Sequence, residues 1–89
     1  MFRVEWLQSA LDELTTLWIL ADPTLRQTLT AASHTIDQRL SINPRSEGES
    51  RSGDRRIAFF PPLFIAFEVD DVHQTVVVGQ VRMFRRRSP

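Results

Sequence analysis

The sequence predicts an α+β fold in which a helical hairpin packs on one face of a small, mainly antiparallel twisted sheet, in the order β-α-α-β-β-β. Three observations predict this fold. One short alternating segment opens the chain, two amphipathic segments follow it, and three strand-like segments fill the second half. The 89 residues suffice for a single domain, 1–89, and not for two.

The first strand and the first helix come from residues 2–20. Apolar and polar residues alternate over 2–6, which is the pattern of a half-buried strand. Ser9 stands three residues before Asp12, which predicts a capping-box start for the helix. The apolar residues then recur at helical spacing, at Leu11, Leu14, Leu17 and Trp18.

The second helix has a clear start and a clear end. Asp22 and Pro23 predict an N-cap followed by proline at the first helical position, and Asn43 with Pro44 predicts the stop. One apolar stripe runs between them, at Leu25, Leu29, Ala32, Ile36 and Leu40. Because almost no loop joins the two helices, we expect an antiparallel hairpin.

The second half of the chain is expected to form a three-stranded meander. Residues 45–54 are polar and rich in Gly and Ser, which predicts a mobile loop before it. The strands are expected at Arg55–Phe60, Leu63–Val69 and Thr75–Phe84. Pro61 and Pro62 interrupt the pairing of the first two, and residues 70–74 form the hairpin loop between the last two.

Alternation along the strands predicts which side of the sheet the helices cover. The covered side has Leu63, Ile65, Phe67 and Val69, joined by Val77, Gly79, Val81 and Met83. The open side has Phe64, Ala66, Glu68, Val76, Val78, Gln80, Arg82 and Phe84. Because this open side is half apolar, we expect a partner to dock there and the isolated chain to dimerise, aggregate or need its partner.

Charge is unevenly distributed although the formal net charge is zero. Residues 1–50 carry four Arg and seven acids, whereas residues 51–89 carry seven Arg and four acids. The basic second half suits an anionic partner, either nucleic acid or an acidic protein segment. Every basic residue is Arg, for which a biased genome composition is an equally good explanation.

Several classes of protein are disfavoured. The absence of Cys excludes disulfides, thiolate metal sites and cysteine nucleophiles. The N-terminal residues lack the pattern of a signal peptide, and no apolar run is long enough to span a bilayer, so we expect a cytoplasmic protein without a membrane partner. His73 beside Asp70 and Asp71 is typical of turn chemistry, and His34 of a surface residue. We expect no metal and no cofactor.

The arginines of the second half are the candidate site. Arg55, Arg56 and Arg82 lie in strands, and Arg85 with Arg86 follows directly, so they could converge at one edge of the sheet as an anion site. A solvated basic tail that aids solubility is the alternative for the last arginines. The open-side aromatics Phe64 and Phe84 suit either a stacked base or a partner's apolar segment.

Residues 53–70 combine a Gly, a basic pair, a strand, a turn and a strand ending in Phe-Glu-Val-Asp, and residues 75–87 form a Val-rich strand that ends in arginines. These two stretches resemble the RelE/ParE toxin superfamily of plasmid-stabilisation-type proteins. Residues 6–14, Trp-Leu-Gln-Ser-Ala-Leu-Asp-Glu-Leu, are similar to the family's first strand-to-helix junction, and Pro44 to its helix-ending proline. The resemblance therefore covers nearly the whole chain.

The resemblance implies the toxin of a type II toxin–antitoxin pair, neutralised by a cognate antitoxin. The leading hypothesis is a ParE-like toxin that binds a target such as DNA gyrase. The alternatives are a RelE-like, metal-independent, ribosome-dependent mRNA endoribonuclease and a diverged, non-toxic interaction module with the same fold. Phe64 stands where the nucleases often have an Arg, and the chain has neither Tyr nor Lys, so the departures favour the ParE-like hypothesis.

The resemblance also assigns roles to the candidate residues. In a nuclease, catalysis would fall to Arg82, Arg86 and Arg56, because guanidinium can stabilise phosphate charge although it is a poor general base. The binding residues under either hypothesis are Arg55, Arg85, Phe64, Gln80 and Phe84. The near-zero net charge disfavours a position among ribosomal RNA phosphates.

Overall fold

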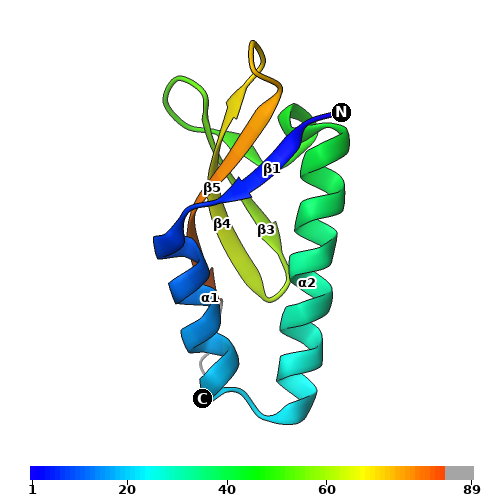
Figure 1. Cartoon of the computed structure of the whole chain (residues 1–89), viewed down its shortest axis with the longest axis vertical. Coiled ribbons are helices and arrows are strands. Elements are labelled where there is room, and N and C mark those ends of the chain that lie inside the picture. The colour runs from blue at the N-terminus through cyan, green and yellow to red at the C-terminus, as the bar shows by residue number, and fades with distance from the viewer. Residues whose placement is uncertain (84–89) are drawn as a thin grey trace.

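The computed structural model describes residues 1–83 and follows the predicted order of main elements (Figure 1). The elements are β1 (Arg3–Trp6), α1 (Gln8–Leu20), α2 (Pro23–Ile42), the 3-10 turn η1 (Pro44–Ser46), β2 (Glu49–Ser50), β3 (Arg55–Phe60), β4 (Leu63–Asp70) and β5 (Thr75–Met83). Within residues 1–83, no helix has the length and apolar character needed to cross a bilayer.

The five strands form one mixed sheet in the order β1-β5-β4-β3-β2. β1 runs parallel to β5, with Arg3 opposite Thr75 and Trp6 opposite Val78. The other three strand pairs are antiparallel. Two helices on a mainly antiparallel sheet confirm the predicted α+β class.

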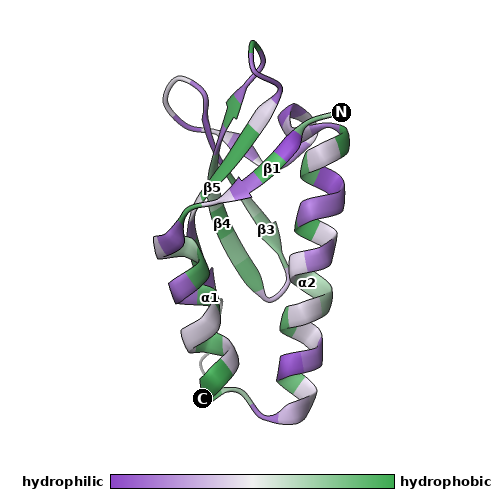
Figure 2. Cartoon of the chain, in the orientation of Figure 1, coloured by the Kyte–Doolittle hydropathy of each residue, from purple (hydrophilic) through white to green (hydrophobic). Residues whose placement is uncertain are grey.

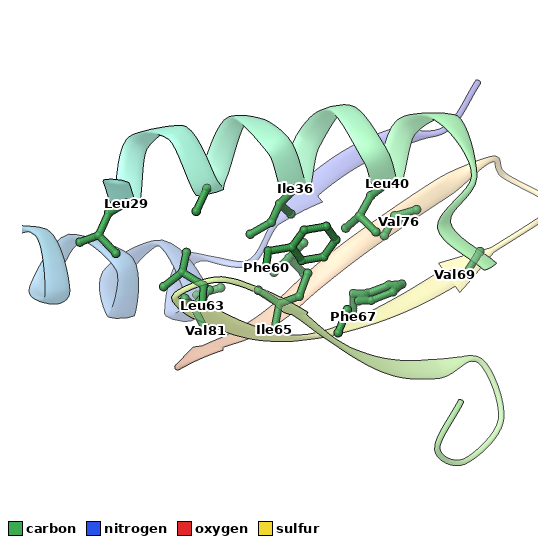
Figure 3. Close-up of a cluster of buried hydrophobic side chains, with 14 of the residues drawn as sticks. Leu29, Ile36, Leu40, Phe60, Leu63, Ile65, Phe67, Val69, Val76 and Val81 are labelled. Atoms are coloured by element: carbon green, nitrogen blue, oxygen red, sulfur yellow. The ribbon is translucent and has the colours of Figure 1, made fainter. Parts of the chain in front are cut away.

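α2 lies along one face of the sheet and buries the stripe that its sequence predicts (Figure 3). Its buried residues are Leu29, Ala32, Ile36 and Leu40, and they face buried side chains of all three long strands. The Oδ1 atom of Asp22 accepts the Leu25 N–H at 2.8 Å, which confirms the predicted N-cap. The colouring of Figure 2 shows the same hydrophobic concentration along β4 and β5.

α1 differs from its prediction at its start and in its burial. The capping box at Ser9 is wrong, because the helix begins at Gln8 after Leu7, whose N–H donates to the Val78 carbonyl at 2.9 Å. Ala10 is its one buried residue, while Leu11 and Trp18 are 40% and 43% exposed. The stripe is only partly covered because α1 lies beside the edge of β5 and not over the sheet face (Figure 1).

A β-bulge interrupts the alternation of β5. Phe67 of β4 lies opposite Val78, whereas the preceding Ala66 lies opposite Gln80, so Gly79 is the extra residue. An extra residue moves every later side chain of a strand to the other face.

The bulge corrects the predicted sides of β5. Val76 and Val78 are fully buried in the core and not on the open side, whereas Val77 and Gly79 are not core residues. Val81, which follows the bulge, is buried as predicted. The predicted docking surface is therefore wrong in including Val76 and Val78, which lie in the core.

The segment 45–54 contains more structure than the mobile loop that its composition predicts. β2 pairs with β3 there, with Glu49 opposite Ile57. Arg45 Nη2 donates to Asp54 Oδ1 at 3.0 Å and also bonds Asp71 Oδ2 at 2.6 Å. One guanidinium thus ties η1 to this loop and to the β4–β5 hairpin.

The two hairpin connections lie where the sequence predicts them. Pro61 and Pro62 form the turn between β3 and β4, whose pairing runs to Phe60 opposite Leu63. The loop that follows Asp70 returns the chain to β5.

Candidate functional site

The face of the sheet opposite α2 carries three rows of side chains from β3, β4 and β5. The register places Phe59, Phe64 and Arg82 in the first row, Ile57, Ala66 and Gln80 in the second, and Arg55, Glu68 and Val77 in the third. We call these nine residues the open face.

The bulge at Gly79 brings the polar residues of β5 onto the open face. Without the extra residue, Gln80 and Arg82 would continue the alternation of Val76 and Val78 and point into the core. With it, both side chains are exposed on the open face. Bulges commonly re-aim side chains beside functional sites.

Two adjoining hollows lie on the open face. One, of about 240 Å³, lies between Arg55 and Gln80. The other, of about 290 Å³, lies between Gln80, Phe64 and Arg82. Ala66 lines both, and its short side chain leaves room between the longer ones around it.

The first row combines an aromatic pair with a cation. The rings of Phe59 and Phe64 are stacked, with centroids 4.5 Å apart and an interplanar angle of 26°. The two residues are 47% and 38% exposed, respectively. Flat, partly exposed rings beside Arg82 suit contact with a base or with a partner's apolar side chain.

The second and third rows are joined across β4. Arg55 Nη2 donates to Gln80 Oε1 at 3.4 Å, and the cross-strand partner of Arg55 is Glu68. The open face therefore carries two guanidinium groups, one amide and one carboxylate, and not a purely basic patch.

Arg82 is held by a residue of α1 that the sequence analysis does not single out. Glu13 Oε2 forms an ion pair with Arg82 Nη1. Glu13 Oε1 accepts the Val81 N–H at 3.1 Å. β1 ends opposite Val78, so beyond this point α1 with Glu13 borders the edge of β5 that β1 no longer pairs with, while β4 pairs with the other edge. No spacing in the sequence distinguishes Glu13 from Asp12, the other acid of the helix.

The structure brings together four of the predicted site residues, Arg55, Phe64, Gln80 and Arg82. Arg56 lies on the other side of β3, where Nε donates to the Glu47 carbonyl at 3.0 Å and Nη2 to the Gly48 carbonyl at 3.2 Å. Phe84, Arg85 and Arg86 lie outside the described residues.

Neither histidine lies on the open face. His34 is on α2, and His73 is in the β4–β5 loop with Nδ1 2.7 Å from Asp70 Oδ2. Within residues 1–83, no three His, Asp or Glu side chains gather as metal ligands would.

The Asp70–His73 pair predicts a loss of stability in acid. The His73 N–H donates to Asp70 Oδ1 at 3.1 Å, and this bond, with that of the imidazole, lowers the pKa of Asp70. A lowered folded-state pKa stabilises the fold above the unfolded value of about 3.9, and the contribution disappears as the pH falls through the folded-state pKa.

Urea unfolding between pH 5 and pH 2 measures this contribution. Asp70→Asn should reduce the acid-dependent loss of stability, and His73→Ala, which keeps the backbone donor, should reduce it less. An unchanged pH dependence in Asp70→Asn would contradict the assignment.

Comparison with known proteins finds likeness in structure alone. No family model and no curated protein sequence matches the chain. The RelBE2 toxin–antitoxin complex of Mycobacterium tuberculosis matches with a TM-score of 0.73 and 21% identity, over 93% of this chain and 98% of that one.

Two further solved structures bear the same likeness. The isolated E. coli RelE toxin matches with a TM-score of 0.64 and 18% identity, over 98% of this chain and 88% of that one. The chromosomal ParDE toxin–antitoxin system of P. aeruginosa matches with a TM-score of 0.63 and 14% identity, over 96% and 98%. At these identities the likeness concerns the fold.

Proposed function

We propose that the chain, which has the RelE/ParE toxin fold, is the toxin of a type II toxin–antitoxin pair and acts by binding a macromolecular target through the open face. The observation that carries this proposal is the bulge at Gly79, which places Gln80 and Arg82 beside Arg55 and Phe64. Two guanidinium groups flanking shallow hollows suit an anionic target surface.

Binding without cleavage, the ParE-like mode with a target such as DNA gyrase, fits the chemistry of this face. A guanidinium stays protonated at neutral pH and therefore cannot accept a proton. The chain has no Lys, Tyr or Cys, and both histidines lie off the open face. Glu68 is the one carboxylate among the nine residues, opposite Arg55.

The first row of the open face favours a second candidate, a RelE-like, metal-independent mRNA endoribonuclease. Arg82 could hold a phosphate while a base stacks against the Phe59–Phe64 pair. The carboxylates able to accept a proton would then be Glu13, which pairs with Arg82, and Glu68 in the third row. In this alternative, Arg55 takes the assisting role that the sequence assigns to Arg56.

A cognate antitoxin is the partner that the solved neighbours suggest, since two of them are toxin–antitoxin systems. α1 supplies an apolar surface for such a partner. Trp18, Ile19 and Leu20 in its last turn are all exposed, and the ribbon at the end of α1 is coloured hydrophobic (Figure 2). An exposed apolar cluster of this kind is typical of a protein-docking surface.

Induced expression in E. coli with three separate readouts tests the proposal. We expect growth arrest with impaired DNA supercoiling and intact mRNA, and rescue by a small protein encoded beside this chain. Cleaved mRNA would support the endoribonuclease. The absence of growth arrest would contradict the toxin assignment and favour a non-toxic interaction module.

A further inference from the structure

Glu13 connects α1 to β5 through both oxygens of its carboxylate. Oε1 accepts the Val81 N–H at 3.1 Å, and Oε2 pairs with Arg82 Nη1. The Glu13 side chain is 29% exposed, compared with 63% for Arg82. The backbone hydrogen bond fixes the carboxylate, and the carboxylate in turn restrains the more exposed guanidinium.

This arrangement leaves one edge of the Arg82 guanidinium available. Nη1 donates to the Val81 carbonyl at 3.1 Å in addition to its pairing with Glu13. Among residues 1–83, no hydrogen bond uses Nε or Nη2 of Arg82. These two nitrogens form an edge that makes bidentate contacts with phosphate and carboxylate groups.

We infer that Glu13 is a positioning residue that holds Arg82 with its Nε–Nη2 edge ready for an anionic group of the target. This inference deepens the function proposed for the open face and rests on it. Glu13 pairs with Arg82 Nη1, so its effect on the target is expected to pass through Arg82.

Two effects of Glu13 on anion binding oppose each other. Its negative charge repels an anion about 6 Å away, which lowers affinity by about threefold in water and by less in salt. Ordering a free arginine side chain on binding costs about a factor of ten in affinity, and Glu13 removes much of that cost beforehand. Positioning therefore outweighs repulsion, and loss of the carboxylate should weaken binding.

Titration of the ¹⁵N-labelled chain with inorganic phosphate tests this inference. The Arg82 Nε–Hε resonance, assigned with Arg82→Lys, should shift with phosphate in the unmodified chain. Glu13→Gln keeps an acceptor for the Val81 N–H but loses the charge, and its phosphate dissociation constant should rise by up to about threefold, the positioning effect less the charge effect. If Glu13→Gln fails to fold, Glu13→Asp replaces it, with the carboxylate kept but its reach shortened.

Asp12→Asn is the matched control. It removes one negative charge from the same turn of α1, where Asp12 bonds Gln8 and not Arg82. We expect phosphate binding in this variant to be unchanged or at most about threefold tighter, which measures the charge effect alone. Equal phosphate affinities in Glu13→Gln and Asp12→Asn would overturn the inference. An Arg82 Nε–Hε resonance that does not shift with phosphate in the unmodified chain would also overturn it.

Growth arrest is measured separately and bears on the proposed function. If the chain is toxic but its phosphate affinity at Arg82 does not depend on Glu13, the positioning role alone is refuted. A non-toxic chain with Glu13-dependent phosphate binding would refute the toxin assignment alone.

Discussion

Replacing Arg82 with alanine is expected to lower toxicity by about 30- to 1000-fold while the fold stays intact. Loss of one charged hydrogen-bonding group at a preorganised site costs about 2–4 kcal/mol. The stability cost is small because the side chain is largely exposed and its ion pair with Glu13 is partly solvated. The measurement is growth arrest over a range of inducer concentrations, with circular dichroism to check folding.

Arg3→Ala is the matched control for Arg82→Ala. Arg3 is also an exposed strand arginine in an ion pair with a glutamate, Glu5, at 2.9 Å, but it lies on β1 opposite Thr75, at the far end of β5 from Arg82. We expect Arg3→Ala to retain toxicity. Full toxicity in the double variant Arg82→Ala, Arg86→Ala would contradict a role of these arginines in target binding.

Gly48→Ala is expected to destabilise the fold by about 2–5 kcal/mol, a large fraction of the stability of a domain of this size. Gly48 has φ +66°, and an added Cβ would lie 1.9 Å from the Ile57 carbonyl oxygen and 2.7 Å from Ala58 Cβ. The clash would separate β2 from β3 and disturb the Gly48 carbonyl that accepts from Arg56.

Gly53→Ala separates the backbone effect from the clash. Gly53 has a similar φ of +57°, but no atom lies within 4 Å of its added Cβ. The expected loss is therefore the left-handed backbone cost alone, about 1–2 kcal/mol. Urea unfolding gives both values, and equal losses in the two variants would contradict the steric argument.

The sequence predicts the fold well where a pattern is long and uninterrupted. The α2 stripe from Leu25 to Leu40 fits the helical period over its whole length, so its buried face could be identified. α1 has a similar stripe, but a sequence pattern does not tell whether a helix covers a sheet face or borders a strand edge. Trp18 is exposed because α1 borders the edge of β5 and does not cover the sheet face.

The candidate site was predictable in its residue types and less so in its geometry. Uninterrupted alternation in β5 predicts Gln80 and Arg82 on the open side together with Val76 and Val78. In the structure Gln80 and Arg82 lie on the open face, whereas the two valines lie in the core. The difference arises from a bulge, whose position depends on pairing with β4 and not on local sequence. Glu13 was missed for a related reason, since its contact with Arg82 joins residues 69 positions apart.

The parallel pairing of β1 with β5 has a consequence for folding during synthesis. Arg3 can pair with Thr75 only after 72 further residues have been synthesised, so β1 cannot join the sheet before β5 exists. Contacts between distant residues slow folding because the chain must close a long loop before they form. The nascent chain therefore completes its sheet, and with it the face carrying Gln80 and Arg82, only once β5 is available.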